Sequence, residues 1–130
     1  MLAHIAVAVA DLSQSAAVYS ALGFTSEPIE VVEHEHVRLQ KWTHSGVCFE
    51  LIEAFPAGAG NVAKFIAKRG PGLHHVALQS QDILSDLQRL NDSGIRTLPG
   101  YPAQGSTGSH VAFLDPHTTG GVLIELVERH

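Results

Sequence analysis

Two glutamates lie inside apolar runs, one in each half of the chain. Glu50 belongs to VCFELI (47–52) and Glu125 to VLIELV (122–127). Strand alternation places each carboxylate beside apolar side chains, and the opposite face of each run is apolar too. Burial of a carboxylate is unfavourable unless a cation, a proton or a hydrogen-bond donor compensates the charge. We therefore expect each glutamate to have a partner.

Two histidines are related by an internal repeat. At a shift of 71 positions His4 falls on His75 without a gap, and the apolar positions of segments 4–24 and 75–95 coincide. The repeat indicates a duplicated supersecondary unit. Each of these histidines opens the first strand of its copy.

The duplicated residues suggest a metal site. If the first and last strands of each copy are neighbours, each copy contributes one imidazole and one carboxylate. Together they supply a His2Glu2 set, His4, Glu50, His75 and Glu125, which suits Zn, Co, Mn, Ni or Fe(II). The alternative is that the histidines make local hydrogen bonds and the glutamates pair with Arg or Lys. The repeat relation of imidazole and carboxylate together favours the metal site.

The sequence of each copy predicts the strands and the helix that position these residues. The apolar period changes from strand-like to helical at Asp11 and at Asp82, which can cap a first helical turn. Gly23 and Gly94 stand where a helix end needs a left-handed backbone. Extended segments follow, at 24–33, 36–42 and 46–53 in the first copy and at 95–98, 109–114 and 121–128 in the second.

These elements predict an α+β fold of two tandem βαβββ modules, whose curved, mainly antiparallel sheets surround a metal-binding cleft. We expect a single domain over residues 1–130. Module one covers about 1–54, a linker helix about 60–70, and module two about 72–130.

Composition excludes several classes of function. The chain has 130 residues, 45% of them hydrophobic, and a net charge of −5. Its basic residues are scattered apart from the short run Lys64, Lys68 and Arg69, which disfavours nucleic-acid binding. The lone Cys48 excludes a disulfide framework and a zinc site built on cysteine pairs. Because no basic residue precedes the first apolar stretch and Asp11 interrupts it, we expect neither a signal peptide nor a membrane span. We expect a cytoplasmic protein.

The remaining candidates carry weaker signals. His34 and His36 lie in a polar run typical of a solvated hairpin tip. His74 has the opposite strand parity to His75, and Glu53 and Glu128 likewise face away from the proposed ligands. His110 and His117 flank the last two strands, where substrate contact is an alternative to a surface role.

The motifs resemble those of the vicinal oxygen chelate superfamily, which includes glyoxalase I, extradiol dioxygenases, bleomycin-resistance proteins and methylmalonyl-CoA epimerases. The chain is similar to the epimerase family over nearly its whole length. The segments that carry this resemblance are HIAVAVADL (4–12), FELIEAF (49–55), VAKFIAKRGPGLHHVAL (62–78) and FLDPHTTGGVLIELVE (113–128). The pairing of GLHH with a terminal GGVLIEL is the most specific of these features.

The resemblance implies that His4, His75 and Glu125 are metal ligands and that Glu50 fills the fourth position, where the family has Gln or Glu. It further implies an epimerase of (2R)- and (2S)-methylmalonyl-CoA with a divalent metal, often Co²⁺, with Zn²⁺, Mn²⁺ or Ni²⁺ as alternatives. Chelation of the substrate carbonyls makes the C2 proton acidic, because an enediolate then forms next to a cation. The family also suggests a homodimer and an acyl-CoA substrate. Our own hypothesis is that the basic helix 62–69 and loop 100–110 contact the CoA.

The resemblance does not identify the general base. Some family members have a glutamate as the proposed base at the position where this chain has Leu39. Glu125, acting with water, and Glu35 are the candidate catalytic residues that are left. Inversion at C2 requires two acid–base groups or one mobile group.

Other functions within the same fold stay open. A glyoxalase I-like lyase could use the same four ligands on a glutathione thiohemiacetal. A metal-free binding protein of the bleomycin-resistance kind would need no ligand set, so the intact set argues against it. An extradiol dioxygenase would use two histidines and one carboxylate on iron, and ranks third.

Overall fold

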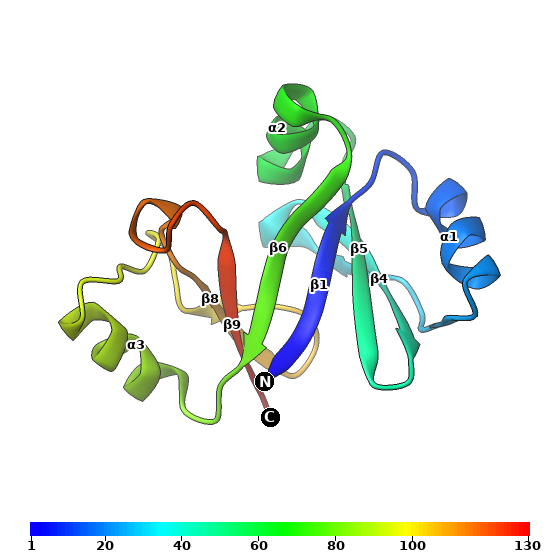
Figure 1. The fold of residues 1–130 in the computed structure, drawn as a ribbon. Helices are drawn as coiled ribbons and strands as arrows, with labels where there is room; N and C mark the ends of the chain where they lie inside the picture. Colours follow the sequence, from blue (N-terminus) through cyan, green and yellow to red (C-terminus); the bar gives the residue numbers. More distant parts are fainter. The chain divides into compact units, whose positions relative to one another are not determined.

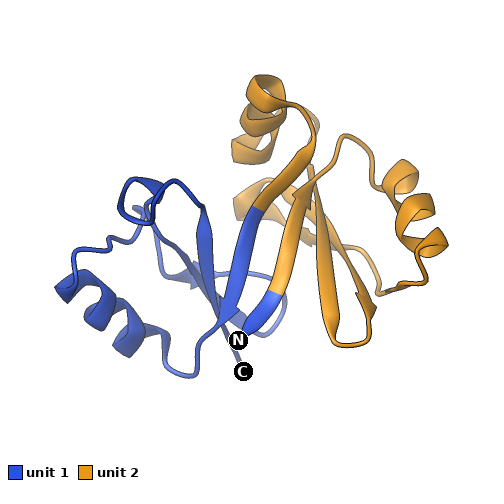
Figure 2. Cartoon of the chain, viewed as in Figure 1, with its two compact units in different colours: residues 1–3, 75–130 blue, residues 4–74 orange.

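The computed structural model describes residues 1–130 and divides them into two compact units. Unit 2 comprises residues 4–74, and unit 1 comprises residues 75–130 together with the first three residues (Figure 2). Within unit 1, the Met1 carbonyl accepts a hydrogen bond from the Gln79 N–H at 2.7 Å. We describe each unit by itself.

Unit 2 is a sheet with a helix on each face (Figure 1). Its elements are β1 (Leu2–Ala8), α1 (Leu12–Ala21), β2 (Thr25–Ser26), β3 (Glu30–Val32), the 3-10 turn η1 (Glu33–Glu35), β4 (Val37–His44), β5 (Val47–Ala54) and α2 (Gly60–Arg69). Strand β5 pairs in parallel with β1 and antiparallel with β4, and β4 pairs antiparallel with β2 and β3.

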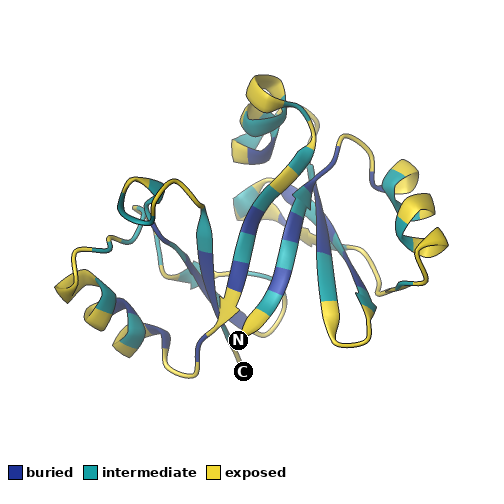
Figure 3. Cartoon of the chain, viewed as in Figure 1, coloured by how far each residue is buried: buried dark blue, intermediate teal, exposed yellow.

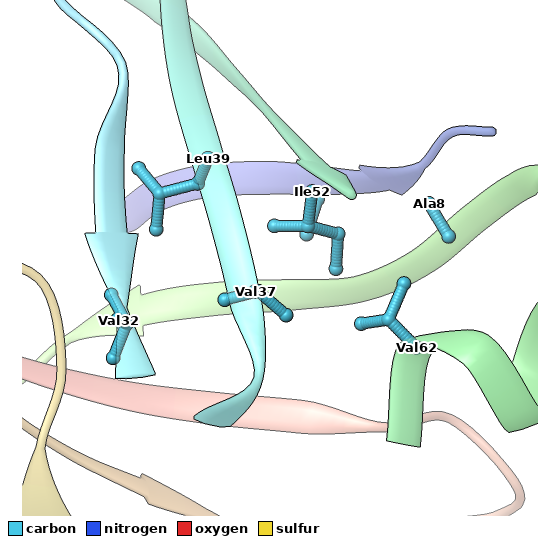
Figure 4. Packing of buried hydrophobic residues seen from close by; sticks show 7 residues of the cluster. Ala8, Val32, Val37, Leu39, Ile52 and Val62 are labelled. Atoms are coloured by element: carbon cyan, nitrogen blue, oxygen red, sulfur yellow. The ribbon is translucent and has the colours of Figure 1, made fainter. Parts of the chain in front are cut away.

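The two helices of unit 2 pack on opposite faces of this sheet. On one face Val62, Phe65 and Ile66 of α2 pack on a cluster drawn in part in Figure 4, which comprises Ala6, Ala8, Val32, Val37, Leu39 and Ile52. On the other face α1 packs through Leu12, Ala16 and Tyr19, as its helical spacing predicts, against Trp42 and Leu51. The face toward α2 is also the face of His4, because β1 buries alternate residues (Figure 3).

Unit 1 repeats the order of a strand, a helix and further strands. Its elements are β6 (Gly72–Gln79), α3 (Ile83–Asp92), β7 (Ala103–Gln104), β8 (Ser109–Phe113), the 3-10 turn η2 (Pro116–Thr118) and β9 (Ile124–Arg129), the first three residues of β6 belonging to unit 2. Strand β9 pairs in parallel with β6 and antiparallel with β8, which pairs with β7. Helix α3 covers one face through Ile83 and Leu87, which pack on Ala112, Leu114 and Leu126. The expected α+β class is therefore confirmed.

Both helix boundaries read from the repeat are also present. Asp11 accepts the Ser13 N–H at 2.7 Å, and Asp82 accepts the Ser85 N–H at 3.1 Å, so each aspartate caps its helix. Gly23 and Gly94 follow the helix ends with φ of 94° and 86°, the left-handed region that glycine adopts without a Cβ clash. None of the helices is both long and apolar enough to cross a membrane.

The predicted extended segments differ from the structure where proline interrupts them. Residues 95–98 form no strand: Thr97 makes one isolated bridge to Leu114, and the short strand lies farther on, at β7. Pro99 and Pro102 separate the two, since proline cannot donate to a sheet ladder. Pro28 likewise divides the predicted strand 24–33 into β2 and β3.

Candidate functional site

The first imidazole–carboxylate pair lies within unit 2. The parallel register of β1 and β5 sets Ala6 opposite Glu50, and His4, two residues before Ala6, shares its face of the sheet. His4 Nδ1 lies 3.6 Å from Glu50 Oε2, and the two side chains are 4% and 9% exposed. Adjacent strands therefore bring a nitrogen and an oxygen donor together in a buried place.

The second pair lies within unit 1 and repeats the first. The parallel register of β6 and β9 sets Ala77 opposite Glu125, and His75 stands two residues before Ala77. His75 Nε2 lies 3.2 Å from Glu125 Oε1, with the same side-chain exposures of 4% and 9%. The adjacency of first and last strand, on which the predicted ligand set depends, is thus present in both units.

The neighbours of the two glutamates differ. In the antiparallel pairing with β4, Lys41 lies directly opposite Glu50 and is itself buried. In the pairing with β8, Phe113 lies directly opposite Glu125, and its ring packs edge-on against His75 with centroids 4.9 Å apart. Pairing of a glutamate with a lysine therefore stays open for Glu50, whereas an aromatic ring occupies the corresponding place beside Glu125.

Sequence reasoning did not single out Lys41. The alternation of residues along β4 could have indicated its burial, because Val37, Leu39 and Lys41 lie on one face of the strand and all three are buried. A lysine among buried apolar residues at period two indicates a charged group on the inner face, where it is unfavourable without a partner.

The donor chemistry of the two pairs fits a divalent transition metal. Imidazole nitrogen and carboxylate oxygen are ligands that Zn²⁺ and neighbouring metals accept, and each carboxylate offsets part of the cation's charge. A buried carboxylate next to an imidazole is also suited to accept a proton and pass it on. The arrangement therefore supports acid–base chemistry and metal ligation.

The two residues considered for the base lie in different settings. Glu35 is in the turn η1, before β4, and its carboxylate lies 3.9 Å from the His34 ring nitrogen with 24% of its side chain exposed. Leu39, where the resembling family has a glutamate, is 4% exposed and packs in the cluster beneath α2. The alternation of residues along the strand did not predict that Glu35 is partly exposed and Leu39 is buried.

The two glutamates set aside by parity have definite partners on the other face of each sheet. Glu53 accepts the Leu12 N–H at 2.8 Å and a hydrogen bond from Arg38 Nε at 2.6 Å. Glu128 accepts the Ile83 N–H at 2.8 Å. Both therefore hold the start of a helix against the last strand of their unit.

The other histidines considered from the sequence lie outside the two histidine–glutamate pairs. The His74 ring packs edge-on against Phe65 of α2, with centroids 4.8 Å apart. His117 lies in η2, highly exposed and 3.1 Å from Asp115. Hydrogen bonds from the His117 backbone and side chain hold the pKa of Asp115 below its ordinary value. His110 lies on β8, opposite Glu128.

Comparisons with known proteins agree with one another. The profile of the Glyoxalase/Bleomycin resistance protein/Dioxygenase superfamily matches residues 3–113. A protein of Cereibacter sphaeroides named ethylmalonyl-CoA/methylmalonyl-CoA epimerase is 36% identical over 128 residues, covering 95% of this chain and 93% of the relative.

Two solved structures are similar in fold over nearly the whole chain. Methylmalonyl-CoA epimerase from Mycobacterium tuberculosis superposes with a TM-score of 0.92 at 31% identity, covering 99% of this chain and 87% of the other. A variant of Streptomyces coelicolor methylmalonyl-CoA epimerase, in complex with 2-nitronate-propionyl-CoA, superposes with a TM-score of 0.90 at 34% identity, covering 99% and 94%.

Proposed function

The chain belongs to the Glyoxalase/Bleomycin resistance protein/Dioxygenase superfamily, and from this premise we propose that it is a metal-dependent epimerase of (2R)- and (2S)-methylmalonyl-CoA. Relatives and solved structures that bear this activity in their names are similar over nearly the full chain. The Streptomyces coelicolor relative holds an acyl-CoA ligand, which supports an acyl-CoA substrate here. The observation that carries the proposal is the buried histidine–glutamate pair, repeated in both units.

We propose that His4, Glu50, His75 and Glu125 hold one divalent cation, Co²⁺ in the first place and Zn²⁺, Mn²⁺ or Ni²⁺ as alternatives. When bound, such a cation polarises the thioester and carboxylate oxygens and stabilises the negative charge that develops as C2 loses its proton. The donor set supports this assignment, because both carboxylates lie beside an imidazole and away from bulk water.

The chain's own residues move the proton. One carboxylate removes the C2 proton from one face of the carbon, and a protonated acid on the opposite face delivers a proton to C2, which inverts the carbon and leaves that acid ionised. Glu125 and Glu35 are the two carboxylates that we propose for this role. Glu125 Oε1 lies 3.2 Å from His75 Nε2, whereas Glu35 lies in a turn where its side chain is partly exposed to solvent. Leu39 offers no acid–base group on β4.

Substrate recognition and assembly follow from the same proposal. We propose that the CoA moiety lies against the basic side chains Lys64, Lys68 and Arg69 of α2 and against loop 100–110. Lys64, Lys68 and Arg69 are exposed, and positive charge there suits the phosphates of CoA. A cytoplasmic homodimer belongs to the same proposal.

Deuterium exchange at C2 of methylmalonyl-CoA tests the proposal. Metal-stripped protein in D2O is followed by proton NMR before and after addition of Co²⁺ or Zn²⁺. We expect exchange only with metal, and loss of exchange in both His75→Ala and Glu125→Ala. The control His44→Ala replaces an exposed histidine at the end of β4, and should exchange normally.

No exchange from folded, metal-loaded protein would contradict the epimerase assignment. A glutathione thiohemiacetal is then the substrate to test next, because a glyoxalase I-like lyase could use the same ligands. Exchange that persists without metal would contradict the role given to the four ligands.

A further inference from the structure

A second cluster of ligating side chains lies on the other face of β9. Glu125 and Val127 share one face of this strand, whereas Leu126 and Glu128 share the opposite face, toward α3. On that face the side chains of His110, Glu128 and His130 place their ligating atoms within 4.8 Å of one another. The whole cluster belongs to unit 1 and does not include the pair formed by His75 and Glu125.

The sheet itself builds this cluster. The antiparallel register sets His110 of β8 directly opposite Glu128 of β9. His130 follows two residues later, so it shares the face of Glu128. Its backbone N–H donates to the Gly108 carbonyl at 2.8 Å, which holds the residue beside the start of β8. Backbone pairing therefore brings the three residues together on one face of β8 and β9.

The ring nitrogens converge with the carboxylate. His130 Nε2 lies 3.3 Å from Glu128 Oε2 and also contacts His110 Nδ1. The two rings meet edge to face, with centroids 4.6 Å apart. Because both nitrogens and the oxygen carry lone pairs when the imidazoles are neutral, the three atoms can bind one cation.

The carboxylate is already oriented for this task. Its other oxygen, Oε1, accepts the Ile83 N–H at 2.8 Å, which leaves Oε2 directed at the histidines. Outer hydrogen bonds of this kind fix a ligating carboxylate and raise metal affinity. The side chains of Glu128 and His130 are 19% and 51% exposed, so the cluster is accessible to ions from solution.

The corresponding place in unit 2 shows what is special about this cluster. There Glu53 also accepts a helix-starting N–H, and Arg38 lies opposite it in the register and donates to its second oxygen. A guanidinium is always charged and has no lone pair to give to a metal. Unit 1 thus has two imidazoles where unit 2 has a permanent cation.

We propose that His110, Glu128 and His130 form a second site for a divalent transition metal of the Zn²⁺ class, with three protein ligands and solvent completing the coordination. The bound ion joins β8 to β9 and, through Glu128, to the start of α3. This site is independent of the proposed epimerase function, because it shares no ligand with it. The competing interpretation is a purely ionic contact between Glu128 and protonated histidines.

Zn²⁺ titration of the metal-free protein against a chromophoric chelator tests the site. The titration is made in a background carrying His75→Ala and Glu125→Ala, which removes one of the two proposed epimerase ligand pairs. We expect His110→Ala and His130→Ala each to weaken Zn²⁺ binding by about tenfold or more. The matched control is His117→Ala, because His117 contacts Asp115 at 3.1 Å but belongs to no three-residue cluster. Equal affinity in all variants would overturn the proposal.

Nuclear magnetic resonance of the unsubstituted chain gives a second readout that does not depend on variant folding. We expect the imidazole ¹⁵N signals of His110 and His130 to shift together as Zn²⁺ is added, while those of His117 stay in place. If the two histidines respond to pH but not to Zn²⁺, the ionic interpretation is correct and the metal site is wrong. Both readouts measure binding alone, so absence of epimerase activity would leave their outcome unaffected.

Discussion

Glu53 and Glu128 make the same hydrogen bond in the two units: each accepts the backbone N–H of the residue that begins a helix, at 2.8 Å. The first N–H groups of a helix have no acceptor within the helix, so an outside oxygen must satisfy them. In both units the oxygen comes from the last strand, three residues beyond the glutamate of the histidine–glutamate pair. One strand therefore carries a candidate ligand on one face and a helix anchor on the other.

The hydrogen bond from the Leu12 N–H to Glu53 should contribute measurably to the free energy of unfolding. We expect Glu53→Ala to lower the free energy of unfolding by about 1–3 kcal/mol, because the buried Leu12 N–H loses its acceptor and Arg38 loses its partner. Urea unfolding followed by circular dichroism measures the change. The control Glu27→Ala removes an exposed carboxylate and should change stability by no more than about 0.5 kcal/mol. Equal effects of the two variants would contradict the anchoring role.

A hydrogen bond between Ser80, which follows β6, and Asp86 of α3 makes a pH-dependent contribution to stability. Buried Ser80 donates to Asp86 Oδ2 at 2.6 Å, and this bond, followed by the one from Arg89, holds the pKa of Asp86 below its ordinary value of 3.8. Because the folded-state pKa is the lower one, the stabilisation is present above pH 3.8 and is lost as the pH falls through the folded-state pKa.

The variant Ser80→Ala tests this contribution. We expect it to lower stability by about 1 kcal/mol at neutral pH. The loss should shrink in acid, once Asp86 is protonated and the bond contributes less. Urea unfolding at neutral and acid pH measures both values, with Ser20→Ala, an exposed serine of α1, as the control. A loss that is independent of pH would show that the hydroxyl acts by packing alone.

The sequence predicted the parts that depend on local patterns. The capping aspartates and the glycines after α1 and α3 act within a few residues, so periodicity and turn chemistry located them. The repeat also indicated that His4 and His75 hold equivalent places, and each lies beside the glutamate of its own unit.

Cross-strand relationships were not predictable in the same way. Strand register is fixed by turns and by packing, not by the composition of one strand, so the position of Lys41 opposite Glu50 emerged only from the pairing of β4 with β5. The helix anchors Glu53 and Glu128 were missed for the same reason. Strand alternation placed both glutamates on the face opposite the proposed ligands, but it did not predict that they accept the N–H groups of Leu12 and Ile83.

Metal binding at the histidine–glutamate pair of unit 1 is directly testable. In a background carrying His130→Ala, which disables the second site, we expect Glu125→Gln to weaken Co²⁺ binding by about ten- to a hundredfold, because the neutral amide offsets none of the cation's charge. Equilibrium dialysis measures the affinity. The control is His74→Ala, which removes the adjacent histidine that packs against Phe65. If His74→Ala weakens binding as much as Glu125→Gln, the ligand assignment is wrong.

Lys41 decides between two roles for Glu50. The two residues lie directly opposite each other, and both are buried. If Glu50 is a metal ligand, Lys41→Met should strengthen Co²⁺ binding by about tenfold, because a neighbouring positive charge that opposes the cation is removed. The metal-free protein should at the same time lose stability, since a buried carboxylate loses a nearby cation.

The comparison with Lys68→Met, which makes the same change of net charge at an exposed residue of α2, separates a local effect on Co²⁺ binding from a general effect of net charge. Co²⁺ affinity and urea unfolding are measured on both variants. Tighter binding in Lys41→Met alone would place Glu50 among the ligands. Unchanged affinity with a large loss of stability would instead make Glu50 the ion-pair partner of Lys41, and His4, His75 and Glu125 would then be the ligand set.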